Sequence, residues 1–545
     1  MFLETRLTNE RIRLHTGAGH WVGRVLRDYL QEHTRRAPDH PAVIGPGERP
    51  TLTYSELLEL ANRAALALLE RGVRPGDVVS VQLPNWPEYV ILLLAIERIG
   101  AVMNPLTTIL REREIAQMLE LGRSRMLVVP ATFRGHDHGA MAMRLAADAP
   151  ALQTILVVGS GAPRSALTWD EFLGDRATPI DPRDRAWLDH LRPDANAVTE
   201  LAFTSGTTGE PKGVLHTHNT AVATVGSTLR RQRLDAASVV HVVTPVGHNA
   251  GYFYGVRLAL QSGAAMVLQD FWDPHQALRL IERHRATFTY GVTTFLVDLL
   301  AAGPERYDIA SLQVYMCGGA SIPPSVAYEA MARLPGRLVP IFGMTEHGHS
   351  TGTDPDTPLD KVCNTDGSPQ PEMELKVVDD RGRRLGPRRE GRLLLRGPFN
   401  FIGYIQGRAF SEAFFDAEDF FDTGDLAYLD EDGFLRITGR SKDLIIRGGE
   451  NVPVKEIEDL LVTHPAILEA ALVAAPDPRL GERAVAYVRL VPDTSVTLDE
   501  VRAFLSERQV TRQFWPEAVT ALAEFPRTAS GKIQKFELRA MAAQP

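Results

Sequence analysis

The sequence predicts an α/β protein in which a large N-terminal domain, made of βα subdomains and a β subdomain, precedes a small α+β domain on a hinge. Three features support this prediction. The chain has 545 residues, which is too long for one hydrophobic core. Short apolar runs alternate with helical patterns from residue 51 to about residue 267. After about residue 366 the pattern changes to hairpin-like strands.

The alternating region is typical of buried parallel strands joined by helices. Helical spacing at 55–72 is followed by the apolar run 77–83 and by a second helical pattern at 88–100. Runs without polar alternation indicate strands that are covered on both faces. Further runs of this kind lie at 124–130, 153–159, 238–245 and 264–270.

The remaining chain predicts two smaller units. Residues 373–397 resemble a hairpin with a polar turn, and 420–440 contain short strands around acidic turns. The tail of about 105 residues is long enough to fold around its own core. We place the boundary within 439–443, which gives an N-terminal domain of residues 1–439 and a mobile C-terminal domain of residues 440–545.

Composition restricts the functional classes. The formal net charge is −9 and the pI is about 6.0, which argues against a nucleic-acid binder because such a protein needs a basic surface. The two cysteines, Cys317 and Cys363, have no CxxC partner, which favours a reducing compartment. The N-terminus lacks an apolar signal region, and the most apolar stretch is interrupted by Glu97 and Arg98. We therefore expect a cytoplasmic protein without a membrane span.

The most informative segment is TSGTTGEPKG at residues 204–213, which follows an apolar run. Its glycines let the backbone close around an anion, while its hydroxyls and Lys212 supply hydrogen-bond donors. A flexible linker would have a similar composition, but the preceding strand and the Pro-Lys-Gly ending favour a polyphosphate loop. The segment is not a Walker A motif, because GxxxxGK[ST] is absent.

This segment resembles the phosphate loop of the adenylate-forming superfamily, which includes acyl-CoA synthetases, adenylation domains of peptide synthetases, and luciferase. Four more segments match in the family's order: GMTE at 343–346, DTGD at 422–425, GRSKD at 439–443 together with GGEN at 448–451, and PRTASGK at 526–532. The likeness extends from about residue 22 to residue 539. The local text of the last two segments is similar to that of medium-chain, alicyclic and aromatic acid–CoA ligases.

The resemblance implies a site for ATP and Mg²⁺. Glu346 corresponds to the Mg²⁺ ligand, which suits a hard carboxylate oxygen, and Thr345 to a donor to the α-phosphate. Asp425 corresponds to the acceptor of both ribose hydroxyls, and Arg440 to a second contact. Taken alone, Glu346 would be a surface acid and DTGD a turn. The implied nucleotide-binding residues are Thr204, Ser205, Gly206, Thr207, Thr208, Lys212, Gly318, Gly319, Ala320, Phe342, Gly343, Met344, Asp425, Ile437 and Arg440.

Lys532 matches the lysine that stabilises negative charge between the acid and the α-phosphate. Without the family match, a lysine so near the terminus would be an exposed residue of a disordered tail. The resemblance also implies that the small domain rotates about Lys442 between two half-reactions. After rotation, Arg447, Gly448, Gly449 and Glu450 would line the channel for coenzyme A.

The acid pocket is expected in residues 245–254, 291–295 and 343–348, and around Gly318. His248 corresponds to the residue at the pocket mouth, with a catalytic role or a capping role as the alternatives. The glycine- and aromatic-rich text favours a bulky apolar acid. The expected lining residues are Asn249, Tyr252, Phe253, Thr293, Gly318 and Gly348.

Asn249 leaves open which of two thiols accepts the acyl group. His-Asn at this place is similar to aryl-acid adenylating enzymes, in which Asn meets a ring hydroxyl and the acyl group passes to a carrier-protein thiol. The local text of 449–454 and 526–535 instead favours coenzyme A. The partners expected are thus a small carboxylic acid and coenzyme A, with an acyl carrier protein as the alternative, in a monomer or homodimer.

Two other classes are open. The first is a non-catalytic nucleotide-binding relative, against which the intact Glu346, Asp425 and Lys532 argue. The second is an oxidative enzyme of the luciferase type, which the sequence pattern does not distinguish from a ligase.

Overall fold

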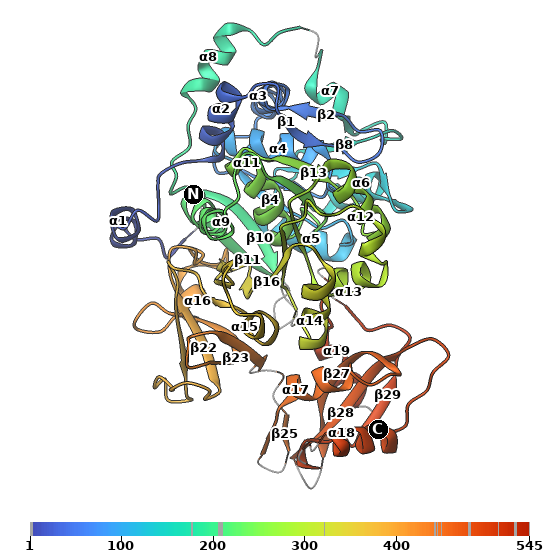
Figure 1. Ribbon diagram of the computed structural model, residues 1–545. Helices are drawn as coiled ribbons and strands as arrows, with labels where there is room; N and C mark the ends of the chain where they lie inside the picture. Colours follow the sequence, from blue (N-terminus) through green and yellow to red (C-terminus); the bar gives the residue numbers. More distant parts are fainter. Residues whose placement is uncertain are drawn as a thin grey trace.

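A computed structural model describes residues 4–175, 178–204, 211–320, 322–440, 443, 445–447, 450–477, 481–508, 510, 512–527 and 531–543. Figure 1 shows two large sheets with their helices in the upper part, a β subdomain below them, and a separate C-terminal unit. This arrangement confirms the predicted α/β class. Among the described residues, none of the helices combines the length and apolar composition that a bilayer crossing requires.

Two seven-stranded sheets form the upper part, and their inner strands are parallel because helical crossovers connect them. Each sheet has one antiparallel edge strand, β2 in the first and β11 in the second. The first sheet has the order β16 (Arg337–Pro340), β15 (Val314–Cys317), β14 (Phe288–Gly291), β12 (Val239–Val242), β13 (Ala265–Leu268), β1 (Pro41–Ile44) and β2 (Thr51–Thr53). The second has the order β11 (Lys212–Thr217), β10 (Val198–Thr204), β4 (Val102–Pro105), β3 (Val78–Val81), β5 (Met126–Pro130), β8 (Thr154–Val158) and β9 (Leu167–Thr168).

Helix α4 (Pro87–Arg98) lies in the core that the two sheets share. All of its residues from Tyr89 to Arg98 are buried, as expected for a helix that is apolar on every side. Its Glu97 bonds the Arg257 guanidinium within the same core. Burial of a charge is costly unless it is paired, so this pair fixes α4 against the short π-helix η1 (Tyr252–Arg257).

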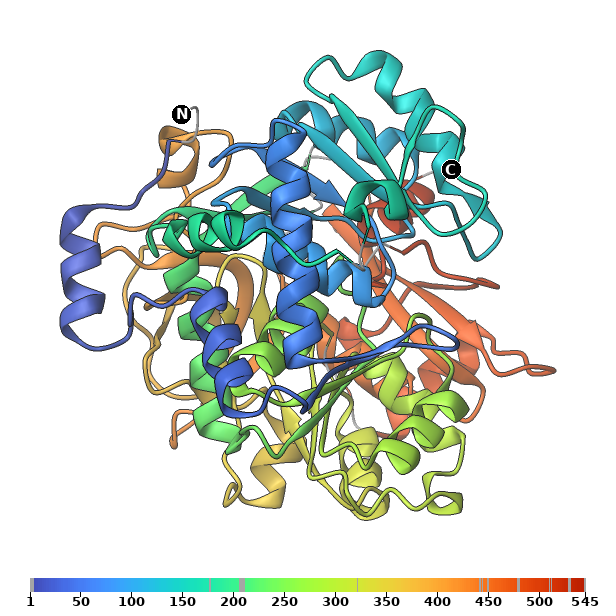
Figure 2. The same ribbon diagram turned by 90° about the horizontal axis from the view of Figure 1, so that it is seen from above.

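The other helices of the N-terminal part cover the sheets or connect their strands (Figures 1 and 2). Helix α3 (Tyr54–Glu70) packs on α4 and begins with a capping box between Thr53 and Glu56. The remaining ones are α1 (Asn9–Gly17), α2 (Leu26–Arg36), α5 (Glu112–Gly122), α6 (His138–Asp148), α7 (Trp169–Leu173), α8 (Pro182–His190), α9 (His218–Gln232), α10 (Asn249–Gly251), α11 (Leu258–Ser262), α12 (Pro274–His284), α13 (Thr293–Ala301), η2 (Pro304–Arg306), α14 (Pro324–Arg333), α15 (Leu359–Asn364) and α16 (Arg408–Glu412).

A four-stranded antiparallel sheet forms the β subdomain. Its strands follow each other in chain order, and the connection from β22 to β23 includes α16 (Arg408–Glu412). They are β21 (Glu374–Val378), β22 (Gly391–Arg396), β23 (Phe421–Leu429) and β24 (Leu435–Arg440). Small two-stranded ladders accompany the larger sheets: β6 (Thr132–Phe133) with β7 (His136–Asp137), β17 (Gly343–Met344) with β18 (Gly348–His349), and β19 (Thr351–Gly352) with β20 (Ser368–Pro369).

The C-terminal unit has its own sheet and its own apolar clusters. Figure 1 shows it next to the β subdomain and below α14. Its strands are β25 (Ile445–Arg447), β26 (Glu450–Val452), β27 (Ile467–Asp477), β28 (Gly481–Leu490) and β29 (Ala518–Ala521), and its helices are α17 (Val454–Leu461), α18 (Leu498–Glu507), η3 (Arg512–Phe514) and α19 (Lys535–Ala542).

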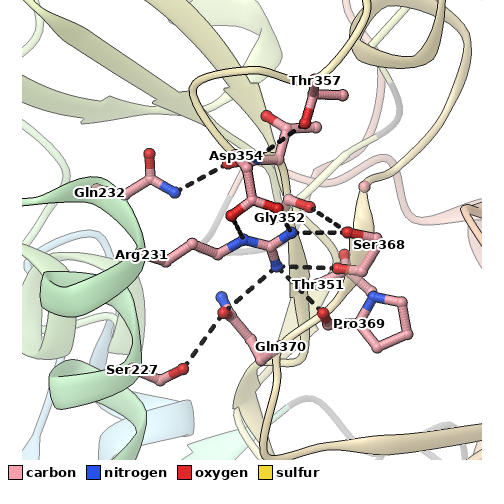
Figure 3. A network of polar contacts seen from close by, with 12 residues as sticks. Ser227, Arg231, Gln232, Thr351, Gly352, Asp354, Thr357, Ser368, Pro369 and Gln370 are labelled. Carbon is pink, nitrogen blue, oxygen red and sulfur yellow. Dashed lines mark hydrogen bonds and ion pairs between the residues drawn. The ribbon is translucent and has the colours of Figure 1, made fainter.

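Arg231, near the end of α9, joins this helix to the segment that follows β18 (Figure 3). Its guanidinium donates to both carboxylate oxygens of Asp354, at 3.0 and 2.9 Å. It also donates to the carbonyls of Ser368 and Pro369, at 3.1 and 3.2 Å. The side chain is 5% exposed, so water cannot replace these bonds. Arg231 therefore fixes the loop that carries β19 and β20.

Replacing Arg231 with Met is expected to lower the free energy of unfolding by about 2–3 kcal/mol, because buried carbonyls lose their donor. Arg230→Met is the matched control on the same helix. Arg230 is 66% exposed and pairs with Glu372, so this change should cost less than about 1 kcal/mol. Urea titrations followed by tryptophan fluorescence compare the two variants. Equal losses would contradict the assigned role of Arg231.

Candidate active site

The residues predicted to carry the chemistry come from four parts of the chain. Thr204 and Lys212 lie where β10 ends and β11 begins, and Glu346 follows β17. Asp425 lies in the middle of β23 and pairs with Arg440 at the end of β24, and Lys532 precedes α19. The structure brings Lys532 from the C-terminal unit close to Glu346, Asp425 and Arg440 of the N-terminal part, since the charges of all three act on its pKa.

Strands β10 and β11 hold the two ends of the glycine-rich segment. Thr204 is the last residue of β10 and lies opposite Lys212, the first residue of β11. The Lys212 ammonium lies 4.0 Å from the centre of the Phe414 ring, an arrangement in which the ring face attracts the cation. The predicted loop residues Ser205, Gly206, Thr207 and Thr208 lie outside the described residues.

Glu346 lies just after the β17 strand and is 6% exposed. Its Oε1 accepts a hydrogen bond of 3.0 Å from the Tyr404 hydroxyl. Burial raises the pKa of the Glu346 carboxyl, an effect that the Tyr404 bond and the charges of Lys212 and Arg440 oppose. The neighbouring Thr345 carbonyl accepts a 2.7 Å bond from Nε2 of His216. These bonds fix the backbone and the carboxylate of the GMTE segment.

Asp425 and Arg440 face each other across the β23–β24 ladder. Arg440 Nε donates to Asp425 Oδ1 at 3.0 Å. Asp425 is 4% exposed, and burial raises its pKa while the charges of Arg440 and Lys532 lower it. The antiparallel register thus turns two residues that are 15 positions apart in the chain into one ion pair.

Lys532 is exposed, and partial loss of hydration lowers the pKa of its ammonium. The positive charge of Arg440 lowers this pKa further, whereas Asp425 and Glu346 raise it. The loop around it is held by Arg527, whose Nη1 donates to the Gly531 carbonyl at 2.8 Å. A cation from the small unit thus lies within electrostatic reach of two buried carboxylates of the large one.

Small residues follow the ends of β14 and β15. A Cβ at Gly318 would lie 2.3 Å from Ile341 Cδ1, and Gly319 has a φ of +84°, so both positions favour glycine. Thr293 Oγ1 donates to the Ala320 carbonyl at 3.3 Å. Cys317 is buried in β15, and burial raises its pKa to about 12, which agrees with a packing role.

Two more predicted nucleotide-site residues are Phe342, which follows β16, and Ile437 of β24. The Phe342 amide donates to Thr351 Oγ1 at 2.8 Å, and the Ile437 amide donates to Asp366 Oδ2 at 2.8 Å. A Cβ at Gly343 would lie 2.5 Å from the Gly348 carbonyl oxygen. Only glycine therefore permits the tight β17–β18 hairpin, which also contains Met344.

The predicted acid-site residues divide into two groups. His248 Nδ1 accepts a 3.2 Å bond from the Ala250 amide and caps α10. Its pKa is lowered to about 4 by burial, with a further contribution from the charge of Lys532. Asn249 is 8% exposed, and its Nδ2 has no hydrogen-bond partner in the described part of the chain. His248 therefore lies within electrostatic reach of Lys532, and the neighbouring Asn249 has an amide donor without a partner among the described residues.

Tyr252 and Phe253 form the second group and are fully buried. The Tyr252 hydroxyl lies 3.5 Å from Glu97 Oε1 and from Arg257 Nη2, in the core between the sheets. Phe253 packs edge-on against His216 with 5.5 Å between ring centres. η1 thus places these two side chains in the core, while the Tyr252 amide donates to the His248 carbonyl at 3.0 Å.

The predicted hinge and coenzyme A residues are only partly described. Lys442, Gly448, Gly449 and the side chain of Glu450 lie outside the described residues. Arg447 is in β25 and forms an ion pair with Glu517. Figure 1 shows β25 at the lower edge of the C-terminal sheet, away from β16.

Three residues that support this site by hydrogen bonds were not predicted from the sequence. Tyr404 and His216 bond Glu346 and Thr345, and Asp366 bonds Ile437. None of the three lies in the motifs identified from the sequence, and their partners are 58, 129 and 71 positions away. No local pattern could have identified them.

The residues present fit a Mg²⁺ ion that is held together with a substrate. Within the described ranges, no three His, Cys, Asp or Glu side chains form a metal-binding group of their own. Mg²⁺ is commonly held by one or two carboxylates together with substrate phosphates. The fixed carboxylate of Glu346 suits such a shared site.

The fold and site define a nucleotide-dependent acid-activating enzyme, and comparisons with known proteins agree. The AMP-binding enzyme family matches residues 30–405, and the AMP-binding enzyme C-terminal domain matches residues 456–532. The chain therefore belongs to the AMP-binding enzymes of the adenylate-forming superfamily and is of the acyl-CoA synthetase type.

Three known proteins illustrate this membership. A medium-chain fatty-acid–CoA ligase of Escherichia coli is 37% identical over 96% of this chain and 91% of its own. A salicyl-AMP ligase/salicyl-S-ArCP synthetase of Mycobacterium tuberculosis is 35% identical over 96% of this chain and 92% of its own. The ATP-bound crystal structure of MatB from Rhodopseudomonas palustris has a TM-score of 0.82 at 26% identity, over 94% of this chain and 98% of its own. The protein is thus an AMP-forming acid–thiol ligase.

Proposed function

We propose that the protein joins an apolar cyclic, aromatic or medium-chain carboxylic acid to AMP and then transfers the acyl group to coenzyme A. The observation that carries this proposal is the grouping of the buried Glu346 with the Asp425–Arg440 ion pair, within electrostatic reach of Lys532. Negative charge builds between the acid and the α-phosphate when the acyl-adenylate forms. A cation positioned there stabilises this charge without transferring a proton.

The other residues would position ATP. Asp425 would accept the ribose hydroxyls, with Arg440 as its neighbour, and Thr345 would donate to the α-phosphate. Mg²⁺ held by Glu346 would neutralise charge on the phosphates. The loop between Thr204 and Lys212 would surround the remaining phosphates with its amides and hydroxyls.

The transfer step requires a second arrangement of residues 440–545. Arg447 lies in β25, on the part of the small unit remote from β16 (Figure 1), so it could reach a pantetheine arm only after rotation about Lys442. In the present arrangement Arg436 of β24 donates to Asp459 of α17 at 3.2 Å. This ion pair would favour the adenylating arrangement and break during rotation.

A carrier-protein acceptor is the second candidate. The buried Nδ2 of Asn249 has no partner among the described residues, and an ortho-hydroxyl on an aromatic acid would satisfy it. The relative named salicyl-AMP ligase/salicyl-S-ArCP synthetase, at 35% identity, also supports this second candidate. Coenzyme A remains the favoured acceptor, because residues 449–454 and 526–535 resemble the corresponding segments of acid–CoA ligases.

Lys532→Ala should reduce acid-dependent ATP–pyrophosphate exchange by about 100- to 1,000-fold, as expected for one lost electrostatic contact to a transition state. The KM for ATP should change little. Lys535→Ala is the control, because Lys535 pairs with Glu458 within the small unit. A similar loss in both variants would contradict the role of Lys532.

Arg436→Met should slow adenylation by about 3- to 10-fold, equivalent to roughly 1 kcal/mol, because the adenylating arrangement loses an interdomain bond. Acyl-CoA formation from supplied acyl-adenylate should not slow. Arg388→Met is the control, since Arg388 pairs with Glu431 within the β subdomain at an exposed site. Equal slowing of both half-reactions would exclude the proposed role.

An acid panel with ATP and Mg²⁺ separates the two acceptors, with coenzyme A or a phosphopantetheinylated carrier protein as the thiol. Mass spectrometry should detect acyl-CoA for one class of acid, and none with Lys532→Ala. Adenylate without acyl-CoA, together with acylation of the carrier protein, would establish the second candidate. Asn249→Ala should then lower kcat/KM for 2-hydroxybenzoate more than for benzoate.

A further inference from the structure

Three aromatic rings from separate elements meet beside the proposed acid site. Tyr254 of η1 is stacked on His349 of β18, with 8° between the ring planes. Tyr290 of β14 packs edge-on against both, with ring centres 6.1 Å from Tyr254 and 5.3 Å from His349. All three are at least 94% buried. We refer to Tyr254, Tyr290 and His349 as the ring cluster.

The Tyr254 hydroxyl is held by two bonds and cannot swing away. The amide of His349 donates to it at 2.6 Å. It also shares a 2.6 Å hydrogen bond with Thr224 Oγ1 of α9, a side chain that is 1% exposed. Rotation of the ring would leave these groups unpaired in the core, which is costly.

The β17–β18 hairpin packs closely against the Tyr254 hydroxyl at Gly348. A Cβ at Gly348 would lie 2.7 Å from Tyr254 Oη and 2.4 Å from Thr224 Oγ1, and its φ of +58° favours glycine as well. A void too small for a water molecule is lined by Tyr290 together with Thr244, Ala250, Gly251 and Gly255, among others. The space between η1, β14 and β18 is thus filled by protein.

These same elements border the proposed acid site, since η1 follows Asn249 and β17–β18 follows Phe342. We propose that Tyr254, fixed by His349 and Thr224, closes the inner end of this site. The acid is then compact, with one ring or a short branched chain, and an extended medium chain is excluded. This inference rests on the proposed acid-activating function and narrows its substrate class.

The test compares benzoate and cyclohexanecarboxylate with octanoate in ATP–pyrophosphate exchange. The unaltered protein should show at least about 10-fold higher kcat/KM for the ring acids. Tyr254→Ala should raise kcat/KM for octanoate by about 10-fold or more and lower it for the ring acids. Tyr254→Phe, which keeps the ring, should retain the preference for ring acids. Thr224→Val should raise KM for the ring acids while kcat and the KM for ATP stay nearly constant.

Binding of acyl-sulfamoyladenosines gives a readout that does not require turnover. Benzoyl-sulfamoyladenosine should raise the melting temperature of the unaltered protein more than octanoyl-sulfamoyladenosine does, and Tyr254→Ala should reverse this order. Preference of the unaltered protein for the octanoyl compound, or no change of order in a folded Tyr254→Ala variant, would overturn the inference. Absence of exchange with every acid would instead overturn the proposed function, while the two analogues would still rank the acyl groups.

Discussion

Two carboxylates, Glu346 and Asp425, are buried where the β subdomain meets the large sheets and the C-terminal unit. A buried carboxylate needs donors or cations nearby to remain ionised. Tyr404 and Arg440 supply these from the large unit, at 3.0 Å each, and Lys532 supplies a further positive charge from the small unit. The position of the small unit is therefore tied to the electrostatics of the site.

Hydrogen-bonded strands and a shared core hold these carboxylates in fixed positions. Glu346 follows a strand whose backbone is bonded to β11 through His216, and Asp425 is fixed by a four-stranded ladder. The shared core around α4, with its Glu97–Arg257 pair, holds η1 and the ring cluster in place. Groups positioned in this way do not need to reorganise when charge develops, which is the physical basis of electrostatic stabilisation.

Much of the fold was predictable because its signals are local. The apolar runs at 77–83 and 264–270 became β3 and β13, and the helical patterns at 55–72 and 88–100 became α3 and α4. The GMTE, DTGD and PRTASGK motifs likewise predicted that Glu346, Asp425 and Lys532 belong to one site. The burial of the Tyr252 and Phe253 side chains in the core was not predictable, because a π-helical turn changes which face each residue presents.

The sequence by itself determined the α/β class, the order of the units and the family, since hydrophobic period and motif spacing are properties of the chain. Only the tertiary structure decided which residues support the candidate site and how the ring cluster packs. Tyr404 meets Glu346 across 58 positions, and Thr224, Tyr254 and His349 converge from three elements. Contacts of this kind arise from packing between distant segments, and no local pattern of residues encodes them.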